Sequence, residues 1–208
     1  MKKIISQATI DRLPLYFRTL RLAAESEDLP IISSEELGRR LDITPEQIRK
    51  DLATFGQFGR KGIGYDVCEL KNKISNILGL QNHWRLAIVG IGHLGGALAN
   101  YTNFASLGFS VVALFDRNKR VIGTEINGIE INDASNMKKI IAEQSVDIGV
   151  ITVPANEAQN VADLLISAGV KGIWNFAPIK LSVTTTIPLV NEDLSVGLSA
   201  LSYHMAQD

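Results

Sequence analysis

A short apolar run followed by a glycine-rich turn constrains the fold of this chain more than any other feature of its sequence. Residues 86–89 form the kind of run that is typical of a buried parallel strand. Six residues with the pattern GxGxxG follow at once: Gly90, Ile91, Gly92, His93, Leu94 and Gly95. The pattern alone is a weak signal, so a helix and then a second strand ending in an acid must follow it.

Both expected segments follow the turn. Helical spacing continues from Ala97 to Phe104, Gly108 closes the helix, and a strand over 111–115 ends at Asp116. Later units comprise a strand over 146–153, a helix over 156–168, a strand over 172–176 and a last strand ending near Val190. This alternation predicts a Rossmann-type domain with a parallel sheet.

The residue types in the turn suit a dinucleotide. Gly90 permits a tight turn, Gly92 lets backbone amides approach a pyrophosphate, and Gly95 lets the helix pack closely on the strand. The start of the following helix adds a favourable partial positive charge. We therefore expect the pyrophosphate of a nicotinamide cofactor to lie at this turn.

The acid at the end of the second strand indicates which cofactor is preferred. Asp116, 26 residues after Gly90, could accept the adenosine ribose hydroxyls and would repel a 2′-phosphate. NAD(H) is therefore expected in preference to NADP(H). Arg117 and Arg120 leave the phosphorylated cofactor open, because either could pair with a 2′-phosphate.

Mostly apolar residues at the ends of two later strands offer a wall for the nicotinamide ring. They are Thr152, Val153, Pro154, Asn175, Phe176, Ala177 and Pro178. Ligands of open α/β sheets bind at these carboxyl ends. Because desolvating a charge is costly, such a wall favours the neutral reduced ring over the cationic oxidised ring. The alternative is that these residues only finish their strands.

The N-terminal region carries start signals for three helices. Helical spacing over residues 9–24 predicts the first helix. Ser33 and Glu36 form a capping-box pattern before a helix that runs to Leu41, and Thr44 followed by Pro45 starts a third. Two capped helices separated by a short turn predict a helix-turn-helix.

Exposed side chains of the third helix suit base recognition. Gln47, Arg49 and Lys50 are predicted to face solvent, where Arg can bridge guanine, Gln can contact adenine and Lys can bind phosphate. The alternative is an ordinary solvated helix face. We interpret the helix as a recognition helix.

A glycine-flanked pair of cations follows the third helix. Arg60 and Lys61 lie between glycines, and Ile63, Tyr65 and Val67 alternate as in a strand with one buried face. This pattern predicts a wing whose basic tip contacts the DNA backbone or the minor groove. The alternative is a flexible loop with incidental charges. The two segments together predict a winged-helix domain.

Composition excludes several classes of protein. A hydrophobic content of 46% and a charged content of 21% exclude a disordered chain, and the net charge of −1 excludes a uniformly basic one. Residues 1–80 carry +2 and the remainder −3. The single Cys68 and three scattered histidines predict a reducing compartment and no metal site. Without a signal-peptide core or a long apolar run, we expect a soluble, cytoplasmic protein that does not bind membranes.

The C-terminal tail shows an apolar helical stripe that needs a covering surface. It comprises Leu194, Leu198, Leu201 and Met205. The stripe could cover its own domain or a second subunit, and a dimer would suit a palindromic DNA site. The expected domains are a winged helix over 1–80, the nucleotide domain over 81–190 and this helix over 191–208.

The length of the chain argues against an enzyme. Only 18 residues follow Val190, which leaves no room for a substrate domain with a proton-transfer group. Two alternatives stay open: an NAD-dependent oxidoreductase with a small accessory domain, and a nucleotide-regulated module whose winged helix binds protein.

Taken together, these motifs resemble the Rex family of redox-sensing transcriptional repressors almost from end to end. The matching stretches are RLPLYFR (12–18), QIRKDL (47–52), FGQFGRKGIGY (55–65), the glycine motif (90–95), TVPA (152–155), NFAP (175–178) and NEDL (191–194). The resemblance implies a homodimer with a domain-swapped C-terminal helix, bound to palindromic operators when NADH is scarce and released by NADH. It also implies that Tyr101 lies near the nicotinamide and that Arg18 and Asp193 form a charged pair coupling the C-terminal helix to the DNA-binding domain.

Overall fold

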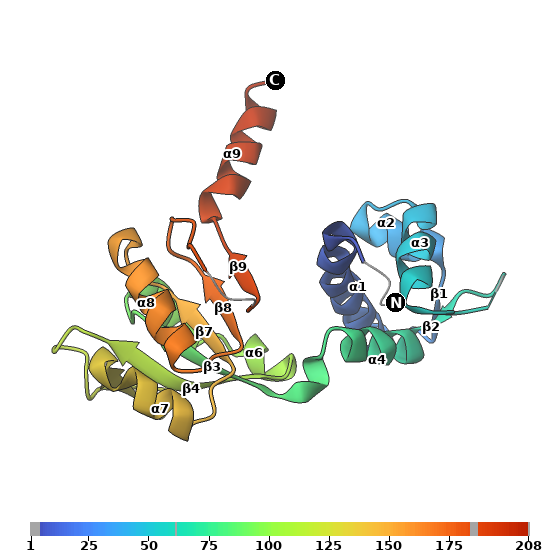
Figure 1. Cartoon of the computed structure of the whole chain (residues 1–208). Helices are drawn as coiled ribbons and strands as arrows, with labels where there is room; N and C mark the ends of the chain where they lie inside the picture. The colour runs from blue at the N-terminus through green and yellow to red at the C-terminus, as the bar shows by residue number, and fades with distance from the viewer. Residues whose placement is uncertain (1–4, 61, 184–186, 208) are drawn as a thin grey trace. The chain divides into compact units, whose positions relative to one another are not determined.

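The computed structural model describes residues 5–60, 62–183 and 187–207. It divides into two compact units, Met1–Asn82 and His83–Asp208. Figure 1 shows a helical unit at the N-terminal end of the chain and a sheet-containing unit at the C-terminal end.

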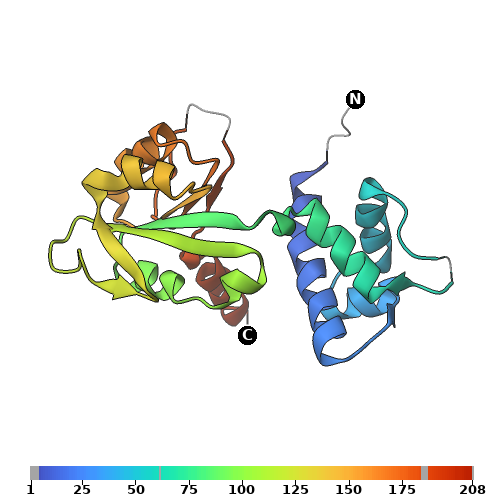
Figure 2. The same cartoon turned by 90° about the horizontal axis from the view of Figure 1, so that it is seen from below.

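The N-terminal unit is a small helical bundle with a two-stranded sheet. Its elements are α1 (Gln7–Ser26), β1 (Ile31–Ile32), α2 (Ser34–Leu41), α3 (Pro45–Phe55), β2 (Tyr65–Asp66), α4 (Val67–Ile77) and the 3-10 turn η1 (Leu80–Asn82). Helices α1 and α4 lie alongside each other (Figure 2). Buried side chains from α1, α3 and α4, among them Tyr16, Ile48 and Ile74, form one core.

The helix starts follow the predicted caps with two corrections. Thr44 accepts a hydrogen bond from the backbone N–H of Gln47, and Ser33 accepts one from Glu36. The Glu36 carboxylate does not complete the predicted capping box, because it binds Arg39 and Arg40 instead. Ser6 caps α1, which therefore begins at Gln7 and not at residue 9, where the helical spacing was predicted to start.

The wing is shorter than the predicted strand over residues 63–67. Strand β2 covers only two residues and pairs antiparallel with β1, and an isolated bridge joins Arg60 to Gly64. The strand ends early because Asp66 caps α4 by accepting from the N–H of Glu69 at 2.7 Å, so that Val67 becomes helical. Lys61, the predicted partner of Arg60, lies outside the described residues.

The C-terminal unit contains one seven-stranded sheet in the order β5-β6-β4-β3-β7-β8-β9. The strands are β3 (Trp84–Val89), β4 (Phe109–Asp116), β5 (Glu125–Ile126), β6 (Ile129–Asp133), β7 (Ile148–Ile151), β8 (Gly172–Asn175) and β9 (Leu189–Asn191). All neighbouring strands run parallel except β5 and β6. The sequence signals missed β5, β6 and α7 (Met137–Glu143), which lie between the first two βα units and the third.

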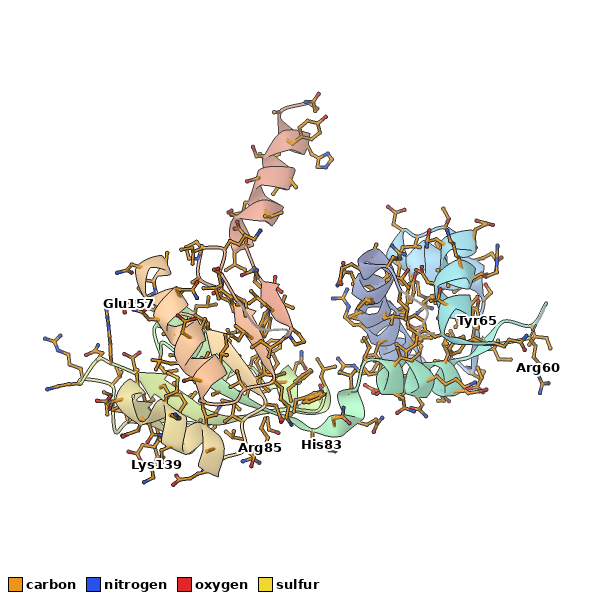
Figure 3. The ribbon with its side chains drawn as sticks, in the orientation of Figure 1. Arg60, Tyr65, His83, Arg85, Lys139 and Glu157 are labelled. Carbon is orange, nitrogen blue, oxygen red and sulfur yellow. The ribbon has the colours of Figure 1, made fainter. Side chains whose placement is uncertain are left out.

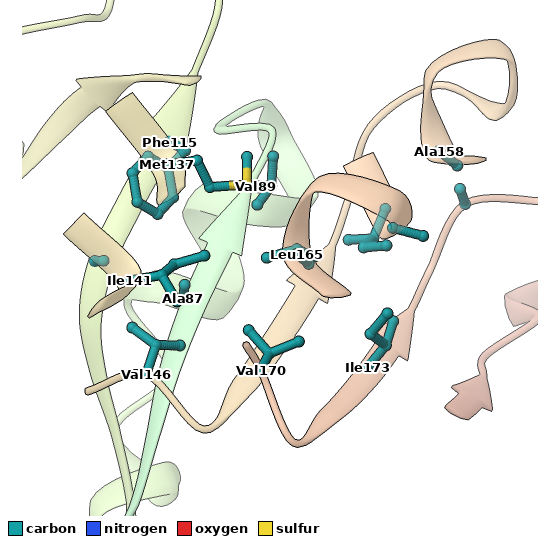
Figure 4. Close-up of a cluster of buried hydrophobic side chains, with 14 of the residues drawn as sticks. Ala87, Val89, Phe115, Met137, Ile141, Val146, Ala158, Leu165, Val170 and Ile173 are labelled. Atoms are coloured by element: carbon teal, nitrogen blue, oxygen red, sulfur yellow. The ribbon is translucent and has the colours of Figure 1, made fainter. Parts of the chain in front are cut away.

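Helices cover both faces of this sheet. Met137 and Ile141 of α7 and Leu165 of α8 (Ala155–Ser167) pack on one face (Figure 4). On the other face, Ala99 of α5 packs against Leu86 and other buried side chains. The helix predicted to continue to Phe104 is interrupted: α5 (His93–Ala99) ends before α6 (Asn103–Ser106) begins. Asn100 ends α5 by donating its side-chain N–H to the Gly96 carbonyl at 2.8 Å.

Helix α9 (Leu194–Met205) follows β9 (Figure 1), and its apolar residues are exposed. Leu194 is 65% exposed and Leu198 70% exposed. Asp193 caps the helix by accepting from the N–H of Ser195 at 2.9 Å. The predicted stripe is therefore present, and it is uncovered within this chain. Among the described residues, no helix combines the length and apolarity needed to cross a membrane.

Candidate nucleotide site and nucleic-acid interface

The glycine turn lies where the strand order of the sheet reverses. Strand β3 lies between β4 and β7, so the loops that follow β3 and β7 flank the crevice in which open α/β sheets bind ligands. A side chain joins these loops: Oγ1 of Thr152 donates to the carbonyl oxygens of Val89 and Gly90, at 3.0 and 2.8 Å. The turn and the Thr152-Val153-Pro154 segment therefore form one structure.

Two glycines of the turn have opposite surroundings. A Cβ atom at Gly95 would collide with the carbonyl oxygen of Gly90 and would lie 2.8 Å from Oγ1 of Thr152. Gly90 itself has a φ of +95°, which favours glycine. At Gly92, by contrast, a Cβ atom would meet open space among the described residues. The turn is thus closed on its inner side and open to a pyrophosphate on its outer side, as a dinucleotide requires.

Asp116 is tied directly to the glycine turn. Its Oδ2 accepts from the N–H of Ile91 at 2.6 Å, and its Oδ1 accepts from the N–H of Asn118 at 2.8 Å. Each carboxylate oxygen retains a lone pair for a ribose hydroxyl. Nη1 of Arg117 lies 2.8 Å from Oε1 of Glu157 on α8, labelled in Figure 3. This ion pair turns one of the two candidate 2′-phosphate ligands toward a carboxylate.

A row of aromatic rings connects Tyr101 to the end of β8. The ring centroids of Tyr101 and Phe104 are 5.0 Å apart, those of Phe104 and Trp174 6.1 Å, and those of Trp174 and Phe176 4.5 Å. Tyr101 is half exposed, at 51%. Sequence reasoning singled out both ends of the row but missed Phe104 and Trp174, because no local pattern links residues 70 positions apart.

Asn175 builds the turn that carries Phe176, Ala177 and Pro178. The side chain is fully buried. Its Oδ1 accepts from the N–H of Ala177 at 3.0 Å, and its Nδ2 donates to the carbonyl of Ile179 at 3.0 Å. Since β7 and β8 are neighbours, the turn lies beside Val153 and Pro154 at the same sheet edge. The predicted nicotinamide wall is thus assembled from two adjacent strand ends.

The three predicted recognition residues on α3 have different environments. Lys50 is exposed. Arg49 is exposed too, but its guanidinium contacts Ser34, Glu35 and Glu46. Gln47 corrects the expectation of a solvent-facing side chain: it is half-buried, because its amide donates to Oδ1 of the buried Asp51 at 2.8 Å.

A concavity of about 580 Å³ lies between α3 and the wing. Arg49 lines one side of it and Arg60 the other. Figure 3 shows Arg60 on the extended loop of the wing, whereas Tyr65 lies at its base near the helices. Glycines at 59, 62 and 64 all have positive φ values, which give this loop its turn. Cations therefore flank the hollow that follows the predicted recognition helix.

Asp51 anchors α3 to α1 and was not given a role by sequence reasoning. It is 1% exposed and accepts from Arg12 at 2.6 and 2.8 Å and from the Tyr16 hydroxyl at 2.7 Å. Burial alone would raise the pKa of Asp51, but the hydrogen bonds from Arg12, Tyr16 and Gln47 outweigh it and lower the pKa to about 2. The sequence signal that could have revealed this role was an acidic residue on the inner face of an amphipathic helix.

Comparison with known proteins matches both units. A family described as "CoA binding domain" matches residues 81–179, and one described as "Putative DNA-binding protein N-terminus" matches residues 4–53. A redox-sensing transcriptional repressor Rex of Clostridium botulinum (strain Hall) is 48% identical over 201 residues, which cover 97% of this chain and 95% of that protein. The Rex of strain Eklund 17B is 46% identical and covers 99% of this chain and 97% of its own length. The chain belongs to the Rex family.

Solved Rex-family structures share the fold. RSP, a Rex-family repressor, in complex with NAD+ and operator DNA has a TM-score of 0.92 and 43% identity, covering 99% of this chain and 94% of RSP. RSP in complex with NADH has a TM-score of 0.90 and 41% identity, covering 99% and 96%. The predicted fold class is confirmed: a DNA-binding helical domain, a Rossmann-like parallel sheet and a C-terminal helix. Membership of the Rex family also confirms a repressor rather than the alternative oxidoreductase.

Proposed function

We propose that this Rex protein is a cytoplasmic homodimer that binds palindromic operator DNA at a low NADH/NAD+ ratio and leaves it when NADH binds. One observation carries the proposal: the crevice at the strand-order reversal holds a glycine turn open at Gly92, in a chain whose other unit is a helix-turn-helix. The nicotinamide cofactor, when bound, would supply a ring whose charge depends on its redox state. The chain supplies the discrimination between those states.

The proposed cofactor contacts surround that crevice. They are Gly90, Ile91, Gly92, His93, Leu94, Gly95, Tyr101, Asp116, Arg117, Thr152, Val153, Pro154, Phe176, Ala177 and Pro178. Asp116 would accept the ribose hydroxyls, and its charge would repel a 2′-phosphate. The Arg117–Glu157 ion pair supports NAD(H) over NADP(H), since it engages one of the two arginines that could pair with a 2′-phosphate. The apolar wall would favour the neutral reduced ring.

The proposed DNA contacts are Gln47, Arg49, Lys50, Arg60 and Lys61. We expect Arg60→Ala to weaken binding to specific and to nonspecific DNA alike, because a phosphate contact is lost. The slope of log K against log salt concentration should fall in magnitude by about 1. Arg49→Ala should instead erode sequence preference by about 1–3 kcal/mol at one base pair. Fluorescence anisotropy over a salt series, with cognate and scrambled duplexes, measures both.

Lys139→Ala is the matched control for these variants. Lys139 is an exposed cation on α7 of the nucleotide unit, and Figure 3 shows it on that unit. The salt dependence and the sequence specificity of DNA binding by the Lys139→Ala variant should equal those of the parent. If Arg49→Ala and Arg60→Ala also leave both quantities unchanged, the proposed DNA face is wrong.

Complementary surfaces on α1 and α9 support a domain-swapped dimer. On α1, the exposed Arg18 lies between Leu15 and Leu22, which are exposed one turn before and one turn after it. On α9, Asp193 precedes an uncovered apolar stripe. We propose that α9 of a second copy covers this face of α1 and pairs Asp193 with Arg18. Tyr101 would lie near the nicotinamide and couple the cofactor site to this pair.

Thermodynamic reciprocity tests the redox function. If NADH weakens operator binding by a given factor, operator must weaken NADH binding by the same factor, and a tenfold effect corresponds to about 1.4 kcal/mol. Titrating NADH by its fluorescence, with and without a saturating palindromic duplex, should show this shift in affinity. The same pair of titrations with NAD+, followed by calorimetry because NAD+ does not fluoresce, should show a much smaller shift. Identical NADH affinities in both titrations would refute the proposal.

A further inference from the structure

The strand that leads into α9 is fastened to the residue that shapes the nicotinamide wall. Besides its bonds to the turn at Ala177 and Ile179, the buried Asn175 donates from Nδ2 to Oδ1 of Asn191 at 2.9 Å. The backbone carbonyl of Asn175 accepts a further hydrogen bond from the backbone N–H of Glu192 at 2.8 Å. A single buried amide therefore belongs both to the wall and to the end of β9.

A second side-chain hydrogen bond also joins β8 to the segment that leads into α9. Nε1 of Trp174 donates to Oε1 of Glu192 at 3.1 Å, and the ring of Trp174 lies between those of Phe104 and Phe176. Phe104 in turn contacts Tyr101, the residue expected beside the nicotinamide. An inner ring of the aromatic row, that of Trp174, thus binds a carboxylate of the segment that follows β9.

The two acceptor residues, Asn191 and Glu192, lie just before the first residue of the C-terminal helix. Asn191 and Glu192 are followed by Asp193, which caps α9 through the N–H of Ser195. Two residues separate Asn191, and one residue separates Glu192, from the first residue of a helix whose apolar stripe is uncovered in this chain. Any displacement of the Phe176–Ala177 turn has to move Asn175, because close-packed interiors transmit small shifts instead of absorbing them.

We propose that the Asn175–Asn191 and Trp174–Glu192 hydrogen bonds transmit the state of the cofactor site to α9, which makes Asn191 and Glu192 positioning residues for the redox response. The inference rests on the proposed function, since it requires that NADH alters operator binding. A ligand shifts a conformational equilibrium only through contacts that differ between the two states. These bonds connect two residues that directly precede the proposed nicotinamide wall to the segment that leads into α9.

The test is the double variant Asn191→Ala/Glu192→Ala in the full chain, which removes both acceptors and leaves Trp174 and Asn175 in place. Without DNA, its NADH affinity should stay within about twofold of the parent, and without NADH its operator affinity should do so too. The factor by which saturating NADH weakens operator binding should fall below about threefold, from a parental factor in the range of about 5–150 that is typical of allosteric coupling.

The conservative pair Asn191→Asp/Glu192→Gln is the matched control. It keeps an oxygen acceptor at both positions and leaves the net charge of the segment unchanged, so the coupling should equal that of the parent. Full coupling in the alanine pair would overturn the inference, as would a loss of NADH affinity beyond tenfold, which would place these residues in the binding site itself. A parent whose operator affinity ignores NADH would refute the proposed function and the inference with it.

Discussion

Gly95→Ala is expected to weaken NADH binding at least a hundredfold, which corresponds to about 2.7 kcal/mol. The added methyl group would collide with the Gly90 carbonyl oxygen and press on Oγ1 of Thr152. Both neighbours belong to the glycine turn or to the loop fastened to it, so relieving the collision must open the turn that we propose to bind the pyrophosphate. The variant should therefore stay on operator DNA in excess NADH. NADH fluorescence titration and gel shifts check the two effects.

Gly96→Ala is the matched control, one residue further along α5. A Cβ atom there would meet open space among the described residues, and alanine is favoured over glycine inside a helix by about 1 kcal/mol. We expect NADH affinity within about twofold of the parent and a slightly higher melting temperature. If both alanine variants bound NADH like the parent, the close packing at Gly95 would have no role in cofactor binding.

Asp51→Asn is expected to destabilise the N-terminal unit by about 3–5 kcal/mol and to abolish specific DNA binding. The change leaves the partly buried Arg12 without its carboxylate, and breaking one partner of a buried ion pair has a cost of this size. Helix α3, which carries the proposed recognition residues, loses its polar anchor on α1. NADH affinity should stay within about twofold, since the nucleotide unit is a separate compact body. Chemical unfolding, anisotropy and NADH titration measure these quantities.

The same carboxylate makes the stability of the N-terminal unit depend on pH. Its folded-state pKa, about 2, lies below the ordinary value of about 3.8, so its stabilisation is complete above pH 4 and is lost as the pH falls toward 2. A shift of this size corresponds to about 2–3 kcal/mol. The exposed Asp11→Asn on α1 should change stability by no more than about 0.5 kcal/mol and keep the acid transition. An acid transition of parental size in Asp51→Asn would contradict this assignment.

Local patterns predicted the starts of α2 and α3 and the strand that leads into the glycine turn, but they missed β5, β6 and α7. Thr44 and Ser33 cap the helices that their spacing indicated, because a hydroxyl and the orphan N–H three residues later are always within reach of each other. The glycine turn was equally predictable, since its conformation depends on six consecutive residues. The wing was predicted too long because two local signals competed at Asp66, and its role as a helix cap prevailed over strand alternation.

Contacts between distant residues were beyond such patterns. Asp51 accepts from Arg12, 39 positions away, and Trp174 binds Glu192, 18 positions away. Neither pairing leaves a periodic signal, because each depends on how two elements pack and on which face each presents. The interruption at Asn100 involves a local bond instead: helical spacing continues through it, but its side chain donates to the Gly96 carbonyl, four residues earlier, where α5 ends.

The sequence by itself therefore determined the two kinds of unit, the family, the dinucleotide turn and the helix-turn-helix, because these follow from spacings within a few residues. Tertiary structure alone decided which side chains fasten these parts: Asp51 joins α3 to α1, Thr152 joins the glycine turn to the loop after β7, and Asn175 joins the turn after β8 to β9. The physical reason is that buried polar groups must find partners wherever the fold brings them together. Those partners come from whichever segments the packing places nearby.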